Sequence, residues 1–280
     1  MDPVERVRVR AREEGAEIER EDILAVEEPL EIRIGSEDGG PVSSFVTTMR
    51  TPGNDEELAA GLLFAEGVLE DRSDLRGVER PADPRIDPEL KANVLIATLR
   101  SAAFDRAAKL RRGTVMGSAC GVCGKTSIEN VIPSDRPPLT CSFTVSPELL
   151  YELPNRLRER QSLFARTGGL HAAGLFSSEG GLQEIREDIG RHNATDKLVG
   201  AFLLRGELPL IDRILLVSGR AGFEIVQKAF AAGIPIVASV SAPSSLAVEL
   251  ADPAGVPLIG FLRGERFNIY THPNRVARSG

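Results

Sequence analysis

The chain has 280 residues, of which 42% are hydrophobic, so it can bury the core of one large domain or two modest ones. Its net charge of −7 and its lack of tryptophan argue against a general nucleic-acid binder. Three cysteines are too few for the disulfide framework of a secreted protein. The first residues hold no apolar signal segment, and no apolar run is long enough to span a membrane. We therefore expect a cytoplasmic protein without nucleic-acid or membrane partners.

The N-terminal half predicts a small part that is rich in strands. Residues 1–22 alternate in charge and indicate a solvated arm, in which three valines could form a ragged edge strand. A helix is predicted after Asn54 and Asp55, because acidic residues fill its first turn and leucines repeat along one face. The other expected elements are strands at 23–34, 43–49 and 93–99, a loop at 71–88 and a short basic helix at 102–112.

The proline-rich segment 133–138 is the best candidate for a domain boundary. The sequence then divides into a charged arm at 1–22, an N-terminal α+β part at 23–135 that ends with a C-x-x-C motif, and a C-terminal α/β part at 136–280. The last two parts could also form one continuous domain.

The C-terminal half predicts an α/β sheet. Ser146 and Pro147 suit the N-cap and first position of a helix. A hairpin is expected at 171–189, and apolar strands then alternate with helices, as in parallel βαβ units. Such sheets bind ligands beyond the carboxyl ends of their strands. The segments predicted at those ends are Ser218-Gly219-Arg220, 239–245 with Ser241, and Arg263-Gly264.

Cys120 and Cys123 form a C-x-x-C pair in which glycine follows each cysteine, so both thiols can be exposed on a flexible backbone. A thiolate is the reactive form, and a neighbouring cation such as Lys125 favours it. Four alternatives remain open for the pair: sulfur chemistry, structural zinc, a thioredoxin-like redox role, or no role. Structural zinc lacks a second ligand pair, since the other cysteine and the three histidines are scattered. Cys141 is predicted to be a buried small hydrophobe.

Two further segments concentrate polar residues. Residues 187–197 include His192 among many hydrogen-bonding side chains, more than the capping of one helix requires. His171 follows two glycines at the start of a strand, where it is either a ligand contact or a satisfied core histidine. The sheet-end segments offer hydroxyls, backbone N–H groups at helix N-termini and arginines, which suit a phosphate or pyrophosphate. A plain charged turn is the alternative for 263–266.

Taken together, these motifs resemble the formate dehydrogenase accessory sulfurtransferase family (FdhD). The resemblance covers about residues 23–272 and depends on the order of several segments, each weak alone. These segments are 119–125, 187–197, 218–224, 239–245 and 260–264.

The resemblance implies a fold similar to cytidine deaminases, with a three-layer core, a mostly parallel sheet and a smaller N-terminal β-rich subdomain. It implies a homodimeric sulfurtransferase that takes persulfide sulfur from a cysteine desulfurase. The sulfur is then passed to the molybdenum (or tungsten) bis(molybdopterin guanine dinucleotide) cofactor before its insertion into formate dehydrogenase. That cofactor is a bound client, and no permanently bound metal is expected.

The resemblance also assigns residues. Cys120 carries the persulfide and Cys123 is its partner. The cofactor-binding segment is Phe261, Leu262, Arg263, Gly264, Glu265 and Arg266. Ser218, Gly219, Arg220, Ser241 and His192 are expected beside it.

Two other functions remain open. A zinc-dependent deaminase-like hydrolase would share the C-x-x-C motif, but the upstream H-x-E half of its signature is missing, since the first histidine is His171. A non-catalytic cofactor chaperone would need the anion-binding segments but not the thiols.

Overall fold

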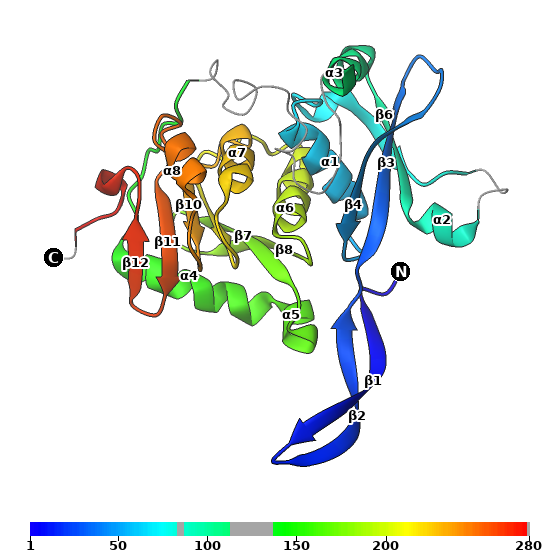
Figure 1. Cartoon of the computed structure of the whole chain (residues 1–280). Coiled ribbons are helices and arrows are strands. Elements are labelled where there is room, and N and C mark those ends of the chain that lie inside the picture. Colours follow the sequence, from blue (N-terminus) through cyan, green and yellow to red (C-terminus); the bar gives the residue numbers. More distant parts are fainter. Residues whose placement is uncertain (83–86, 113–136, 279–280) are drawn as a thin grey trace.

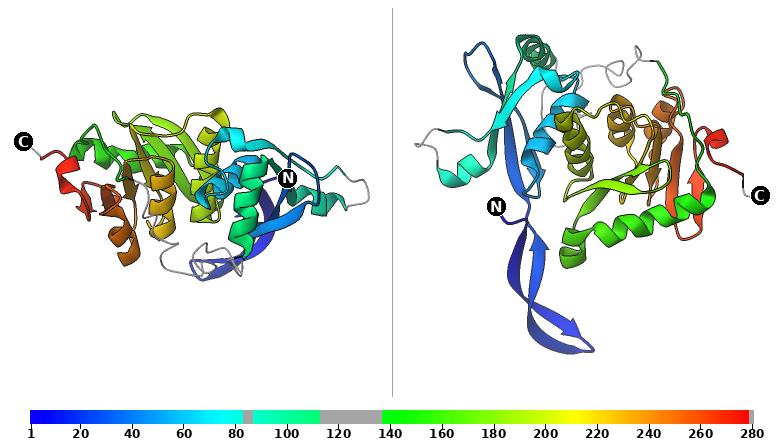
Figure 2. Two further views of the ribbon diagram at one scale, coloured as in Figure 1. Left: turned by 90° about the horizontal axis from the view of Figure 1, so that it is seen from above. Right: turned by 180° about the vertical axis from the view of Figure 1, so that it is seen from behind.

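The computed structural model describes residues 1–82, 87–112 and 137–278. Figure 1 shows two sheets with helices packed between and around them, and a long hairpin that projects from the molecule. The hairpin is formed by β1 (Val4–Glu13) and β2 (Ala16–Ala25). It stands away from both sheets in the view of Figure 1 and in the reverse view of Figure 2. A regular hairpin thus replaces most of the solvated arm that the sequence indicated.

The N-terminal sheet has four described strands in the order β4-β3-β6-β5. Its strand β5, which the sequence analysis placed in a loop, is a short strand at the sheet edge with Leu75 buried in the core. The predicted helix after Asn54 is present as α1. The elements of this part are β3 (Glu28–Ser36), β4 (Ser43–Arg50), α1 (Asp55–Ala65), η1 (Arg72–Asp74), β5 (Leu75–Glu79), α2 (Pro88–Ala92), β6 (Val94–Leu99) and α3 (Ser101–Arg112).

The C-terminal sheet has six described strands in the order β12-β11-β10-β9-β7-β8. Only β9, β10 and β11 run parallel, and the other three pairings are antiparallel. The predicted mostly parallel sheet is therefore wrong, because a hairpin closes each end: β7 with β8, and β11 with β12. These strands are β7 (His171–Ser177), β8 (Leu182–Asp188), β9 (Arg213–Val217), β10 (Ile236–Ser239), β11 (Leu258–Arg263) and β12 (Arg266–Ile269). The likeness to cytidine deaminases stays a prediction.

Helices cover both faces of this sheet. Leucines of α4 pack on one face with Ile214, Leu216 and Ile236, while α6, α7 and α8 pack on the other with Leu215 and Val237. Ser146 caps α4 by accepting a hydrogen bond from the Leu149 N–H, as its sequence predicts. The helices are α4 (Pro147–Arg160), α5 (Ser162–Thr167), α6 (Arg191–Arg205), α7 (Phe223–Ala231) and α8 (Ser245–Ala251), and η3 (Pro273–Arg275) follows β12.

Helices α1 and α6 join the two sheets. The larger hydrophobic core runs without a break from Leu30 and Ile32 of β3, through both helices, to Leu215 of β9. The predicted boundary between residues 135 and 136 lies at the end of a segment outside the described residues. On either side of that segment, the chain contributes to one core.

Candidate functional site

The predicted ligand-binding segments meet at one edge of the C-terminal sheet. Ser239 pairs with Val217 at the carboxyl ends of β10 and β9, and the preceding Ala238 pairs with Ile259 of β11. The segments that follow are tied together by backbone hydrogen bonds. The N–H of Phe261 donates to the carbonyl of Ser241 at 3.0 Å, and that of Ser244 donates to Ala221 at 3.1 Å. Ser218, Gly219, Arg220, Ser241 and Phe261 therefore share this edge, as the sequence predicts.

Two helices begin at this edge without a side-chain cap. Gly190 precedes α6 and Gly222 precedes α7, and neither provides a side chain to bind the free N–H groups of the first turn. His192 Nδ1 lies 2.8 Å from Glu224 Oε2, so an ion pair or hydrogen bond connects the two helix starts. Uncapped N–H groups and the helix dipole favour an anion at such positions.

Arg191 lies at the start of α6, next to His171 of β7 and Gly219. A methyl group on Gly219 would lie 3.1 Å from His171 Nδ1 and 3.7 Å from Arg191 Cδ, so glycine leaves room for both side chains. Arg191 Nε is buried and has no hydrogen-bond partner among the described residues. Ser218 lies beside His171 and Gly219, since its Oγ accepts a hydrogen bond from the N–H of Ala172, the residue after His171. A cation with an unused donor thus lies among two histidines and two helix N-termini.

Burial and this positive surrounding lower the pKa of His171 below its ordinary value of 6.5. Burial is the largest cause, followed by the charges of Arg191 and His192, while Asp188 acts in the opposite direction. His171 is therefore a neutral imidazole at neutral pH and can donate or accept one hydrogen bond at each ring nitrogen.

The segment 261–266 forms the end of β11 and the turn to β12. Phe261 has a φ of 54°, a left-handed conformation that is rare for a bulky residue and is often found at functional sites. A register shift between Gly260 and Arg263 accompanies it. Leu262 is buried in the core under α4, whereas Arg263 and the three residues after it are exposed. The exposed residues are Gly264, Glu265 and Arg266.

A pocket of about 530 Å³ opens at the same edge, between the sheet and helices α4 and α5. His171, Ser218 and Val240 line it from the sheet. The sequence analysis missed the opposite wall, where the guanidinium of Arg158 lies 4.0 Å from the centre of the Phe164 ring. Other lining residues include Asn155, Gln161, Gly168 and Gly169. The break between α4 and α5 at Gln161 brings this wall over the pocket, and nothing local in the sequence indicates that contact.

Much of the polar segment 187–197 has a structural role. Asp188 and Lys197 are buried and 2.7 Å apart, and Lys197 also donates to the carbonyl of Thr51 at 2.8 Å. Asn193 donates to the carbonyl of Met49 at 2.7 Å. These bonds fasten α6 to the N-terminal sheet, so they account for most of the polar side chains in this segment. Only Arg191 and His192 are left at the ligand edge.

Cys120 and Cys123 lie outside the described residues. Cys141 is buried as predicted, and its Sγ lies 3.1 Å from the carbonyl of Phe143. Within residues 1–82, 87–112 and 137–278, no group of three or more histidine, cysteine, aspartate or glutamate residues could hold a metal ion. The same residues contain no helix that is both long and apolar enough to cross a membrane.

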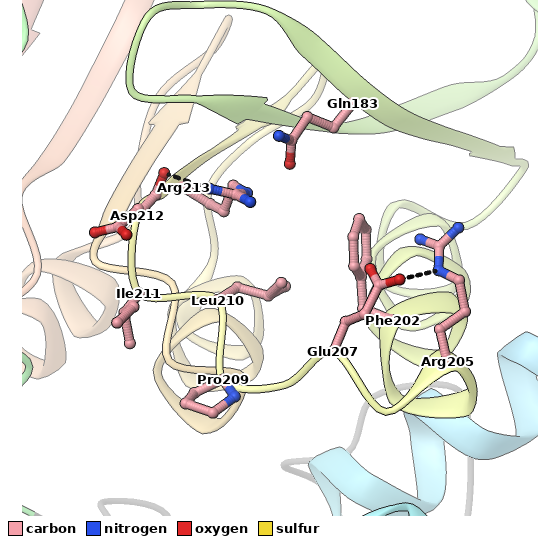
Figure 3. A pocket seen from close by; sticks show the side chains of 9 residues that line it. All are labelled: Gln183, Phe202, Arg205, Glu207, Pro209, Leu210, Ile211, Asp212 and Arg213. Carbon is pink, nitrogen blue, oxygen red and sulfur yellow. Dashed lines mark hydrogen bonds and ion pairs between the residues drawn. The ribbon is translucent and has the colours of Figure 1, made fainter.

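A second pocket, of about 560 Å³, lies at the opposite end of β9. Figure 3 shows Gln183, Arg213 and Leu210 directed into it, with Phe202 beside them. Arg205 lies at the rim, where its guanidinium contacts the Phe202 ring and pairs with Glu207. Because this pocket lies away from the converging sheet-end segments, Arg213 provides a matched control for arginines at the ligand edge.

The chain is similar to proteins of one known family. The model of the FdhD/NarQ family matches residues 25–277. The sulfur carrier protein FdhD of Streptomyces coelicolor is 48% identical over 275 residues, which cover 98% of this chain and 95% of that protein. The sulfur carrier protein FdhD of Mycobacterium tuberculosis is 47% identical and covers 92% of this chain and 93% of its own. The sulfur carrier protein FdhD of Sulfurisphaera tokodaii is 42% identical, and the match covers 98% of this chain and 99% of that protein.

The fold is also similar to a crystal structure of a candidate formate dehydrogenase accessory protein from Desulfotalea psychrophila. The TM-score is 0.73 with 24% identity, and the match covers 99% of this chain and 100% of that one. The resemblance predicted from the sequence is thereby confirmed, and the chain belongs to the FdhD/NarQ family.

Proposed function

We propose that this chain is a sulfur carrier in the maturation of formate dehydrogenase. It takes sulfur from a cysteine desulfurase and transfers it to a molybdenum bis(molybdopterin guanine dinucleotide) cofactor. Relatives at 42–48% identity are named sulfur carrier protein FdhD, which supports this role. We further propose that the carrier acts as a cytoplasmic homodimer with a fold similar to that of cytidine deaminases, as the family resemblance implies.

One observation supports the cofactor most directly: the sheet-end segments converge beside two uncapped helix N-termini and the unpaired Nε of Arg191. A guanine dinucleotide carries a pyrophosphate, which needs clustered N–H donors and a fixed cation. Arg191 and the first turn of α6 would bind that group. Exposed Arg220 and Arg263 would meet further phosphate oxygens from the solvent side.

The adjoining pocket suits the base. It combines an aromatic ring, an arginine plane and amide groups, which are the groups that stack on a purine and hydrogen-bond to its edge. In this proposal Phe164 and Arg158 form the stacking wall, and Asn155 and Gln161 contact the edge of the guanine. His171, neutral and directed to the same pocket, contributes a hydrogen bond rather than a charge.

The thiols perform the transfer. The thiolate of Cys120 attacks the outer sulfur of the donor persulfide, the donor's S–S bond breaks, and the donor cysteine leaves as a thiolate. Attack by the Cys123 thiol on the Cys120 persulfide then forms a Cys120–Cys123 disulfide and releases hydrosulfide to the cofactor. A dithiol reductant restores both thiols for the next cycle.

Calorimetry with GDP tests the cofactor site. Arg191→Gln should weaken GDP binding by about tenfold or more, because a hydrogen bond to a charged group contributes about 1.5–3 kcal/mol. Arg213→Gln, in the pocket at the other end of β9, should leave the affinity unchanged. Equal affinities in the wild type and Arg191→Gln would contradict the proposed site.

Mass spectrometry and rescue of a target formate dehydrogenase test the sulfur chemistry. After incubation with a cysteine desulfurase and cysteine, the Cys120 peptide should gain the mass of one sulfur atom. Cys120→Ala should neither gain it nor restore activity. If Cys120→Ala and Cys123→Ala both restored full activity while Arg191→Gln did not, the chain would be a non-catalytic cofactor chaperone. One tightly held zinc ion per chain would instead favour the deaminase-like hydrolase.

A further inference from the structure

The β1–β2 hairpin has two different faces. Directly paired residues of an antiparallel hairpin project to the same face, and successive pairs alternate between faces. The body face begins with the Val4–Ala25 pair, where Val4 is buried and Ala25 lies beside Gly169 at the end of α5. Farther out, this face carries half-buried Ile23, paired with Arg6, and otherwise only charges. The charged residues are Arg6, Arg8, Arg10 and Arg12 of β1, with Glu17, Glu19 and Glu21 of β2.

The other face, here called the outer face, is largely apolar. Ile18 and Leu24 are 39% and 46% exposed on it, an unusual condition for large aliphatic side chains on a projecting element. A two-stranded hairpin with one uncovered apolar face is marginally stable in water. The residues of the outer face are Val7, Val9 and Ala11 of β1, with Ile18, Arg20, Asp22 and Leu24 of β2, and smaller or acidic residues at its ends.

The edges of the hairpin oppose the addition of an identical strand. Two β1 strands placed edge to edge would bring their rows of arginines together, and two β2 strands would do the same with glutamates. Like charges on neighbouring strands destabilise such a pairing. Association of identical hairpins must therefore use a face.

The outer face is complementary to itself. About the Arg8–Glu21 pair, Val7 mirrors Val9, Ile18 mirrors Leu24 and Arg20 mirrors Asp22. The exception is Glu5, which mirrors Ala11 near the end of the face. A two-fold axis at that level, perpendicular to the strands, stacks each strand antiparallel on its own copy. Val7 then faces Val9 of the second copy, and Ile18 faces Leu24. The two charges also match, because Arg20 faces Asp22 of the second copy.

We propose that the outer face binds the same face of a second copy of this chain, hairpin on hairpin and antiparallel. A two-fold interface requires a patch that is complementary to itself, and this face meets that condition in both apolar and charged positions. A partner of another kind would need no such symmetry. The proposal rests on the proposed homodimer and states where its interface lies, but it does not depend on the sulfur chemistry. A dimer that survives the outer-face substitutions would contradict the interface and leave the homodimer in place.

A charge exchange measured by analytical ultracentrifugation tests the pairing of Arg20 with Asp22. Arg20→Asp and Asp22→Arg each place like charges opposite one another and should raise the dimer dissociation constant by more than about tenfold. An equimolar mixture of the two variants restores both opposite-charge contacts and should form a heterodimer. Asp22→Arg leaves the contact of Arg20 with Glu13 at 2.6 Å in place, so its effect does not depend on that ion pair.

Two glutamate substitutions separate the outer face from other exposed apolar sites. Ile18→Glu should yield a monomer, whereas Ile211→Glu, at a 56% exposed isoleucine on the body, should leave the dimer intact. A wild-type chain that stays monomeric at every concentration would overturn the proposal, since the face would then belong to a different partner. Dimeric single-charge variants, or a mixture that remains monomeric, would overturn it as well.

Discussion

Gly61 of α1 and Gly200 of α6 meet backbone to backbone where the two helices cross. A methyl group on Gly200 would lie 1.9 Å from the carbonyl oxygen of Glu57 and 2.8 Å from the backbone nitrogen of Gly61. A methyl group on Gly61 would lie 1.9 Å from the carbonyl oxygen of Asp196. The helices can approach this closely only because both positions are glycine.

Gly200→Ala should therefore separate α1 from α6 and destabilise the chain by about 3 kcal/mol or more, since a backbone carbonyl cannot move aside as a side chain can. Urea denaturation measures the change. Gly77→Ala is the matched control, because a methyl group there meets nothing within 4 Å, and its free energy of unfolding should stay close to that of the wild type. Equal stability of the two variants would show that the helices can move apart at little cost.

Lys197→Met should cost about 3–5 kcal/mol of stability, because it leaves the fully buried Asp188 carboxylate without its cation. Arg10→Met breaks ion pairs whose side chains are at least 67% exposed and should change stability by less than about 0.5 kcal/mol. The double variant Asp188→Asn, Lys197→Met should be more stable than Lys197→Met alone. A Lys197→Met loss as small as that of Arg10→Met would show that the pair contributes nothing.

The imidazole of His171 should titrate below 6.5 in NMR spectra. A lowered pKa means that the folded chain binds this proton less tightly than the unfolded chain. The contribution of His171 to the free energy of unfolding is thus complete above pH 6.5 and falls as the pH drops below it. Arg191→Gln removes one cation and should move the pKa upward, whereas Arg213→Gln should not. If the pKa of His171 were the same in Arg191→Gln and the wild type, the charge of Arg191 would not be a cause of its lowering.

Burial raises the pKa of Asp196 to about 6, although Lys228 lies 2.6 Å away. Lys228→Met removes the attraction that favours the ionised carboxylate, so the pKa should rise further. The loss of stability relative to the wild type should then grow as the pH rises above about 6, because a raised pKa stabilises the folded state only while the group is protonated. Lys109→Met, at an exposed lysine, should give a loss that does not depend on pH.

The sequence predicted the elements whose signals are local. Ser146 caps α4 and Pro147 follows it, and acidic residues fill the first turn of α1, although Asn54 makes no side-chain cap there. Both signals involve only neighbouring residues. The sheet-end segments could be placed together as well, since parallel strands with helical connections align their carboxyl ends. The hairpin at 171–189 was predicted, but its place in the sheet could not be, because a hairpin can join either edge of a sheet.

The rest of the site depends on contacts between distant residues. Arg158 and Phe164 reach the pocket only because α4 ends at Arg160 and the chain turns into α5. The density of polar side chains around Asp188 and Lys197 indicated a functional role. Their structural partner, Thr51, is more than a hundred residues away in the sequence. No periodicity or spacing within a segment contains that information.

Helix α6 is buried along eleven consecutive residues, from Asn193 to Leu203, with α1 and the N-terminal sheet on one side and the C-terminal sheet on the other. Its amide hydrogens can therefore reach solvent only when both sheets have come apart. In hydrogen exchange these amides should be among the slowest of the chain and should report the free energy of global unfolding, whereas amides at the tip of the β1–β2 hairpin exchange through local opening. One helix thus makes the two sheets a single cooperative unit.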